Sequence, residues 1–190
     1  GGYTAQKHNY SLAAGLAILP HIVGDHAPLR NPTSWQAIEQ ATELFIAFCG
    51  VGTRNSQVEP GGMVAHSAMP WLERLARKGI KLVSVTPLRH DTPAFMDAEW
   101  WSPRPNTDVA LMMGLAHTLV TEGLHDPAFL ARYTTGFERF EAYLTGASDG
   151  VAKSAEWAAN ITGLRAQDIQ ALAREMASKR TMIATSYSLQ

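Results

Sequence analysis

The residues best placed to do chemistry lie in one short stretch, WWSPRPNTDVALMMGLAHTLVTEGLHD, which covers residues 100–126. Four polar residues precede or begin a long apolar run that favours a helix: Arg104, Asn106, Thr107 and Asp108. A helix N-terminus offers unpaired N–H groups and a partial positive charge, so it suits a negatively charged group. These residues therefore either start the helix, with Asn106 or Thr107 as its cap, or bind a ligand. The stretch by itself favours capping.

Polar residues also follow three apolar runs that resemble strands. They are Gly50, Gly52, Thr53, Arg54, Asn55 and Ser56 after the first run, Thr86 and Arg89 after the second, and Ser186, Tyr187 and Ser188 in the third. Ligands of doubly wound sheets collect at the carboxyl ends of strands, near helix N-termini. The segment GVGTRNSQ matches neither the GxGxxG nor the GxxxxGK[ST] phosphate-binding motif, and alone it is typical of an ordinary loop.

Charge, apolar runs and the count and spacing of cysteine and histidine argue against several kinds of partner and site. The net charge of −1 gives no reason to expect a nucleic-acid or membrane-surface partner. No segment approaches the roughly 20 consecutive apolar residues of a membrane span. Cys49 is the only cysteine, so the chain forms no internal disulfide, which leaves both the cytosol and the periplasm open. The histidines lack the spacing of metal ligands, so no metal site is predicted within the chain.

The elements that must position these residues alternate between strand and helix. Apolar runs at 44–50 and 80–87 predict two buried strands, and 180–188 predicts a third. Helices are expected at 11–23 (interrupted or ended near Pro20), from a cap at Thr33 or Ser34 to Ala41, and at 63–79, 107–122, 127–133, 137–145, 152–162 and 166–179. Segment 88–105 is expected to be irregular. Long helical connections between strands favour right-handed crossovers, so we predict an α/β fold with a doubly wound, mostly parallel sheet flanked by helices.

The stretch that opens on RPNTDVALM resembles a known family. The motifs PNTDVALM, GLAHTL, GLHD, FL, SDG and KxAEWA, in this order, are similar to the molybdenum reductases of S-oxides and N-oxides. These are the dimethyl sulfoxide, trimethylamine N-oxide and biotin sulfoxide reductases. The segments YSLAAGLAILPHIVG, TSWQAI and RTMIATSYSLQ extend the resemblance over essentially the whole chain.

The resemblance implies an interior piece of a longer catalytic subunit that carries a bis(molybdopterin guanine dinucleotide) molybdenum cofactor. Residues 1–190 would form one α/β cofactor-binding domain, with residues 1–32 packing against a neighbouring domain. The family's molybdenum-ligating serine would precede the first residue, so no catalytic residue is assigned within the chain. The implied partners are a small-molecule S-oxide or N-oxide substrate, an electron-donor protein and the rest of the subunit.

By position, the resemblance also implies which residues contact the cofactor. They are Ser11 near a pterin arm, Asn55 and Ser56 after the first strand, Val85 and Thr86 at the end of the second, Asn106, Thr107 and Asp108 in the NTD turn, and Tyr187 and Ser188 at the end of the third. We expect Asp108 to accept charge-assisted hydrogen bonds from N1–H and the amino group of guanine. Backbone N–H groups and hydroxyls at the strand ends would bind ribose and pyrophosphate.

Two departures from the family pattern leave the oxide that is reduced unassigned. The first strand ends in FCGVG where the family usually has Trp-x-Ala-Asn/Asp-Pro, and Thr86-Pro87 replaces Asn-Pro or Asp-Pro after the second. Two alternatives also stay open: a stand-alone nucleotide-binding α/β domain without redox activity, and a scaffold.

Overall fold

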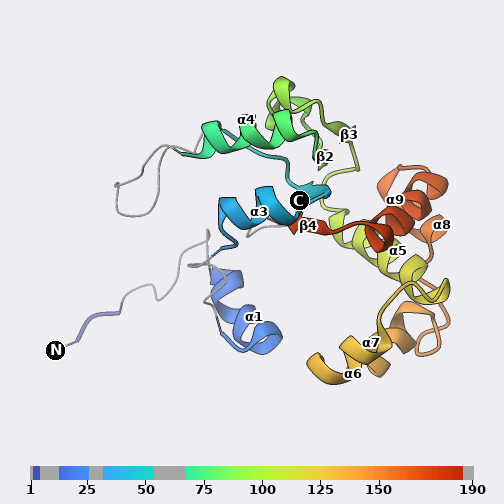
Figure 1. The fold of residues 1–190 in the computed structure, drawn as a ribbon. Helices are drawn as coiled ribbons and strands as arrows, with labels where there is room; N and C mark the ends of the chain where they lie inside the picture. The colour runs from blue at the N-terminus through green and yellow to red at the C-terminus, as the bar shows by residue number, and fades with distance from the viewer. Residues whose placement is uncertain (1, 5–12, 26–31, 54–66, 186–190) are drawn as a thin grey trace.

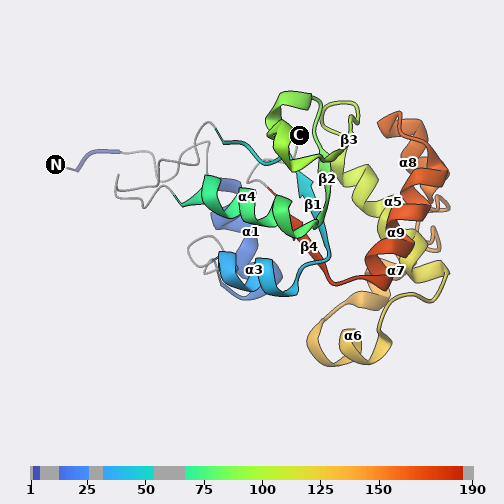
Figure 2. The same ribbon diagram turned by 45° about the horizontal axis from the view of Figure 1, so that its top comes forward.

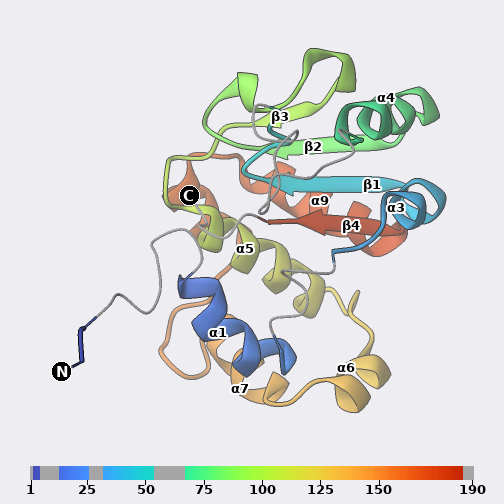
Figure 3. The ribbon, with the colours of Figure 1, turned by 90° about the vertical axis from the view of Figure 1, so that its left-hand side faces the viewer.

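A four-stranded parallel sheet forms the centre of the protein, in a computed structural model that describes residues 2–4, 13–25, 32–53 and 67–185. The strands are β1 (Leu44–Phe48), β2 (Lys81–Val85), β3 (Glu99–Trp101) and β4 (Thr181–Ala184), in the order β3-β2-β1-β4. Every neighbouring pair is parallel, so all four carboxyl ends meet at one edge, as the arrowheads in Figure 3 show. The predicted α/β fold with a parallel sheet is confirmed.

Helices cover both faces of this sheet, because successive side chains of a strand point to opposite faces. Leu44, Ile46 and Phe48 of β1 pack in one apolar cluster with residues of three helices. These helices are α5 (Asp108–Thr121), α8 (Ala155–Thr162) and α9 (Ala166–Ser178). Phe45 and Ala47 pack on the opposite face with α3 (Trp35–Ala41) and α4 (Ala68–Lys78). Figure 1 shows the two helical layers on either side of the strands.

The remaining elements lie at the margins of the sheet. Two short 3-10 turns, η1 (Arg89–Asp91) and η2 (Ala94–Met96), connect β2 to β3. Helices α6 (Pro127–Tyr133) and α7 (Phe137–Leu144) lie beyond α5, away from the strands (Figures 1 and 2). Helix α1 (Ala13–Val23) has no buried residue, and it runs through Pro20 to Val23. The expected interruption near Pro20 is therefore wrong.

The structure confirms the residues predicted to start and end two of the helices. Ser34 caps α3 by accepting a hydrogen bond from the N–H of Ala37 at 3.3 Å. Gly79 ends α4 in the left-handed conformation with φ 74°, as expected for a glycine cap.

The segment expected to be irregular, residues 88–105, contains the strand β3, which has only three residues and forms its ladder with β2. So short a strand has no periodicity of its own to detect.

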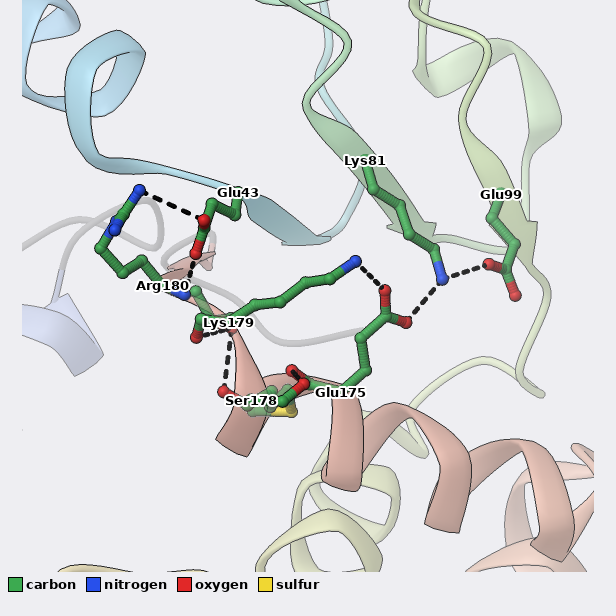
Figure 4. Close-up of polar contacts among 9 residues, drawn as sticks. Glu43, Lys81, Glu99, Glu175, Ser178, Lys179 and Arg180 are labelled. Carbon is green, nitrogen blue, oxygen red and sulfur yellow. Dashed lines mark hydrogen bonds and ion pairs between the residues drawn. The ribbon is translucent and has the colours of Figure 1, made fainter.

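Ion pairs bind together the amino edge of the sheet (Figure 4). Lys81, which begins β2, lies 2.6 Å from Glu175 of α9 and 3.2 Å from Glu99, which begins β3. Lys179 also contacts Glu175, at 2.7 Å. Arg180, just before β4, pairs with Glu43, just before β1, at 3.2 Å. The charges of this edge are thus satisfied within the chain.

The strand order creates a switch point at the opposite, carboxyl edge. From β1 the chain adds β2 and then β3 on one side, and it returns to place β4 on the other side of β1. In open α/β sheets, ligands bind in the crevice outside the carboxyl ends of the strands, where the order reverses. The described start of the loop after β1, residues 49–53, leaves the sheet at this edge.

Candidate functional site

Asp108 is the most unusual polar residue at the carboxyl edge. It is the first residue of α5 and only 3% exposed. Burial raises the pKa of its carboxyl group, and a hydrogen bond from its own backbone N–H partly offsets this rise in pKa. No ion pair joins the carboxylate to another part of the chain that the structure describes. A buried carboxylate without a charged partner is costly, so Asp108 is the residue of this edge whose burial calls for an explanation.

The turn before Asp108 is built by hydrogen bonds within the chain. The hydroxyl of Thr107 donates to the carbonyl of Arg104 at 2.5 Å, and it does not cap α5. Asn106 adopts the left-handed conformation with φ 65°, which asparagine tolerates better than most residues. Asn106 is exposed, so its amide is accessible beside the start of α5.

Arg104 has a structural role in this turn. Its guanidinium donates to the carbonyls of Asn160 and Ile161 at 2.9 and 3.0 Å, and its backbone N–H donates to the carbonyl of Thr162 at 2.9 Å. These carbonyls belong to the last turn of α8, where a positive charge is favourable. Arg104 thus anchors the turn to α8.

Val85 ends β2 and Thr86 follows it at the same carboxyl edge. The side chain of Val85 is fully buried in the core, and its carbonyl accepts from the N–H of Cys49 at 2.8 Å. Thr86 donates its hydroxyl to Asp91 at 2.8 Å, while its carbonyl accepts from the indole of Trp100 at 2.8 Å. Its N–H donates to the carbonyl of Trp101 at 3.0 Å. The carbonyl of Val85 and the hydroxyl, carbonyl and N–H of Thr86 are thus all bonded within the chain.

A buried pair of hydroxyls fixes the loop that follows β1. Ser84 and Thr92 are 1% and 9% exposed, and their hydroxyl oxygens lie 2.6 Å apart. Thr92 also accepts from the N–H of Val51 at 3.2 Å. Neither residue was predicted from the sequence. The polar residue Ser84 inside the largely apolar strand KLVSV is the feature that could have indicated a buried hydrogen bond here.

A cavity of about 570 Å³ borders this hydroxyl pair, on the face of the sheet that carries η1 and η2. Its lining includes Ser84, Arg89, Thr92, Asp97 and Trp100. The guanidinium of Arg89 lies 5.8 Å from the centre of the indole ring of Trp100. Asp108 is not among the lining residues, because it starts a helix that covers the opposite face.

The structure thus brings five of the ten predicted contact residues to one edge of the sheet. They lie at the end of β2 or at the start of α5: Val85, Thr86, Asn106, Thr107 and Asp108. The other five lie outside the described residues, namely Ser11, Asn55, Ser56, Tyr187 and Ser188. Among the described residues, no group of three His, Cys, Asp or Glu side chains is arranged to hold a metal ion. None of the helices described is long and apolar enough to cross a membrane.

The fold defines an α/β domain of the doubly wound class, with a buried carboxylate at the carboxyl edge of its sheet. Among solved structures, acetylene hydratase from Pelobacter acetylenicus is similar, with a TM-score of 0.59 over 78% of this chain and 19% of that one. The two sequences are 20% identical, so the likeness concerns the fold alone. No protein-family model matches the sequence.

Sequence comparison identifies closer relatives. Biotin sulfoxide reductase from Cereibacter sphaeroides is 43% identical over 100% of this chain and 26% of its own length. Dimethyl sulfoxide/trimethylamine N-oxide reductase from Rhodobacter capsulatus is 41% identical, and trimethylamine-N-oxide reductase from Haemophilus influenzae is 34% identical. Both are matched by 100% of this chain, over 23% of their own length.

The chain is therefore homologous, over its whole length, to the biotin sulfoxide, dimethyl sulfoxide and trimethylamine N-oxide reductases. This confirms the resemblance on which the predicted contacts rest. The chain spans about a quarter of the length of these relatives.

Proposed function

We propose that this chain is part of a molybdenum-dependent reductase of S-oxides or N-oxides, in which it binds one molybdopterin guanine dinucleotide arm. One observation carries the proposal: Asp108 presents a buried carboxylate, without an ion pair in the described chain, at the carboxyl edge of a doubly wound sheet. The homology to reductases of biotin sulfoxide, dimethyl sulfoxide and trimethylamine N-oxide supports the reaction class.

The hydrogen-bond acceptor at this position, the carboxylate of Asp108, favours a base over a phosphate. A carboxylate repels phosphate, but it accepts two parallel hydrogen bonds from N1–H and the exocyclic amino group of guanine. Such charge-assisted bonds are roughly twice as strong as neutral ones, and a buried setting strengthens them. The buried acid therefore fits the guanine end of the arm, while the pyrophosphate would lie towards the loops after β1 and β4.

Residues outside the described part of the chain complete the proposed contacts. Asn55 and Ser56 follow β1 in the sequence, and Tyr187 and Ser188 follow β4. These are the two strands that flank the switch point, where nucleotides bind in this class of fold. Ser11 would lie near a pterin arm. The roles of these five residues rest on the family resemblance.

In the whole enzyme the bound cofactor would supply the oxygen-atom transfer chemistry. This chain would bind and orient the guanine-bearing arm, and would shield its base from water. The substrate, an S-oxide or N-oxide, and an electron-donor protein would meet the rest of the subunit. Helix α1 supports an association with that remainder, because it is apolar and has no buried residue.

Nucleotide binding by the purified chain tests the proposal directly. We expect GDP to raise the free energy of unfolding, by about 2.7 kcal/mol at 100 times its dissociation constant. Inosine diphosphate lacks the amino group and should bind more weakly, and ADP weaker still, since it lacks N1–H. Asp108→Asn should remove this preference for guanine. Asp168→Asn is the matched control, because Asp168 also lies in the first turn of a helix, α9.

The outcomes separate the proposal from its alternatives. Equal binding of GDP and ADP would refute a guanine site at Asp108, and binding of neither would favour a scaffold. In the full-length protein, Asp108→Ala should lower the molybdenum content, measured by mass spectrometry of the metal. Guanine-selective binding by a full-length protein that holds no molybdenum would instead indicate a nucleotide-binding domain without redox activity.

A further inference from the structure

Hydrogen bonds between distant segments bind the loop after β1 to the turns after β2. The N–H of Val51 donates to the hydroxyl of Thr92, which is 41 residues away, at 3.2 Å. That hydroxyl lies 2.6 Å from the hydroxyl of Ser84 on β2. We refer to Val51, Ser84 and Thr92 as the hydroxyl latch. It joins the loop at residues 49–53 to the segment that contains η1 and η2.

Close packing at Gly50, the residue before Val51, supports the latch. Gly50 has φ 72°, and a Cβ atom placed on it would lie 2.9 Å from both the Cβ and the carbonyl oxygen of Asp91. Asp91 is held in turn by the hydroxyl of Thr86, at 2.8 Å. The loop therefore packs against η1 at Gly50, and the N–H of Val51 bonds to Thr92, the residue that follows η1.

The strand ladder does not require the latch. The register of β1 with β2 ends at Phe48 and Val85, and Cys49 adds a hydrogen bond to the carbonyl of Val85. Val51 lies beyond this point, where the chain has already left the sheet, while Ser84 is still part of β2. Two buried hydroxyls that satisfy each other at a strand end thus fix the direction in which the loop departs.

We infer that Ser84 and Thr92 are positioning residues, which hold the loop after β1 in place for the cofactor arm. This inference rests on the proposed function. The loop at residues 49–53 leads directly to Asn55 and Ser56, for which we propose contacts with the arm. A shift at Val51 would change the direction in which residues 49–53 leave β1, although neither Ser84 nor Thr92 need touch the cofactor.

The test combines three variants with a control. Thr92→Val keeps the shape of the side chain and removes the hydroxyl, Thr92→Ser restores a hydroxyl, and Ser84→Ala removes only the second member of the pair. Thr118→Val is the matched control, since the hydroxyl of Thr118 is also buried but donates to the carbonyl of Gly114 within α5. Each variant is made in the 190-residue chain.

Two measurements report the position of the loop without any ligand. Amide hydrogen exchange is followed at Val51, and the reaction of a thiol reagent is followed at Cys49, the only cysteine of the sequence. We expect Thr92→Val to accelerate exchange at Val51 about tenfold, which corresponds to about 1.4 kcal/mol, since the hydrogen bond of Val51 is lost and the hydroxyl of Ser84 loses its partner. The Cys49 reaction should become several-fold faster, and Ser84→Ala should give smaller changes.

Binding of GDP is the third measurement. Its dissociation constant should rise about tenfold in Thr92→Val and return close to the wild-type value in Thr92→Ser. Thr118→Val should leave exchange at Val51, the Cys49 reaction and GDP binding unchanged, even where it lowers the melting temperature.

The outcomes distinguish this inference from the proposed function. Failure of the wild-type chain to bind GDP would refute the proposed function, and the two loop measurements would still decide whether the latch exists. Unchanged exchange at Val51 in both Thr92→Val and Ser84→Ala would overturn the latch. A freed loop with an unchanged dissociation constant for GDP would overturn the positioning role.

Discussion

At the scale of single residues, Asp108 combines low exposure with a raised pKa. Burial disfavours its charged form, so its folded-state pKa lies above the value of about 3.9 typical of an unfolded chain. Between these two pKa values the folded state binds more protons than the unfolded state. Stability is therefore lost as the pH rises through this window, and it stays lower at neutral pH. A ligand that donates hydrogen bonds to the carboxylate would offset this loss.

The first prediction follows from the sign of this effect. Without ligand, Asp108→Asn should raise the free energy of unfolding at pH 7, by on the order of 1 kcal/mol, because a poorly satisfied charge is removed. The gain should disappear below the unfolded pKa, where Asp108 is protonated in both states. Urea unfolding at pH 3 and pH 7 measures this difference. Asp168→Asn, an exposed control that breaks an ion pair with Arg165, should show no such gain.

A second residue-scale prediction concerns Gly50. Gly50→Ala should cost about 1–3 kcal/mol of stability, since alanine at φ 72° is strained and its Cβ would overlap Asp91. Gly79→Ala is a suitable comparison, because Gly79 has a similar φ of 74° but open space around it, and it should lose only the strain energy. Equal losses in the two variants, measured by urea unfolding, would argue against close packing of the loop on Asp91.

At the scale of elements, the contact between α5 and α8 sets the position of Asp108. A Cβ on Gly114 would lie 2.7 Å from the Cβ of Ala158, so the two helices approach closely at this glycine. Both helices belong to the same apolar cluster as β1 and β2. The start of α5, and with it the candidate site, depends on this crossing.

The third prediction tests the crossing with a pair of substitutions. Gly114→Ala should lower the free energy of unfolding by about 1–3 kcal/mol through overpacking, although alanine favours the helix by up to about 1 kcal/mol. Adding Ala158→Gly should recover part of the loss, because the second substitution frees the space. Additive losses in a double-mutant cycle would mean that the two positions do not share the contact.

The ion-pair cluster at the amino edge yields a fourth prediction. Lys81→Met removes contacts to Glu99 and Glu175, and the partly exposed position of Lys81 limits the cost to about 1 kcal/mol. This cost should shrink in 1 M salt, which screens charges beyond about 3 Å. Arg77→Met serves as control, since within the described residues Arg77 forms an exposed pair with Glu73 at 3.7 Å and no other ion pair. Thermal unfolding at low and high salt measures both variants.

At the scale of the whole molecule, α1 stands apart from the sheet and its two helical layers. Its sequence AAGLAILPHIV is strongly apolar, yet Ile18 and Ile22 are 55% and 69% exposed. The chain spans about a quarter of its relatives' length. An apolar helix with this exposure fits our proposal that residues 1–32 pack against another part of a longer subunit.

The fifth prediction follows from this exposure. Ile22→Asp should leave the stability of the chain within about 0.5 kcal/mol, because little packing is lost. In a full-length protein it should destabilise the fold, since a charge would enter a buried interface. Val151→Asp, at another exposed apolar position, should be neutral in both settings. A large loss in the chain alone, seen by urea unfolding, would mean that α1 packs within these 190 residues.

From the sequence alone we predicted β1, β2, β4 and most helix boundaries correctly. Apolar runs and caps such as Ser34 and Gly79 are local signals, so they can be read without knowing what the segment contacts. The parallel sheet followed from the long helical connections between these strands. The resemblance to the reductases was also carried by the sequence, because the motifs occur in order along it.

The contacts between distant segments depend on the tertiary structure. The strand β3 forms because its backbone pairs with that of β2. Arg104 also donates to carbonyls of α8 that lie 56 and 57 residues away. The latch between Val51 and Thr92 likewise depends on the order of the strands. Such hydrogen bonds leave no periodic trace in the sequence, since their geometry is set by how the sheet and helices pack. For the same reason, the burial of Asp108 emerged only from the folded chain.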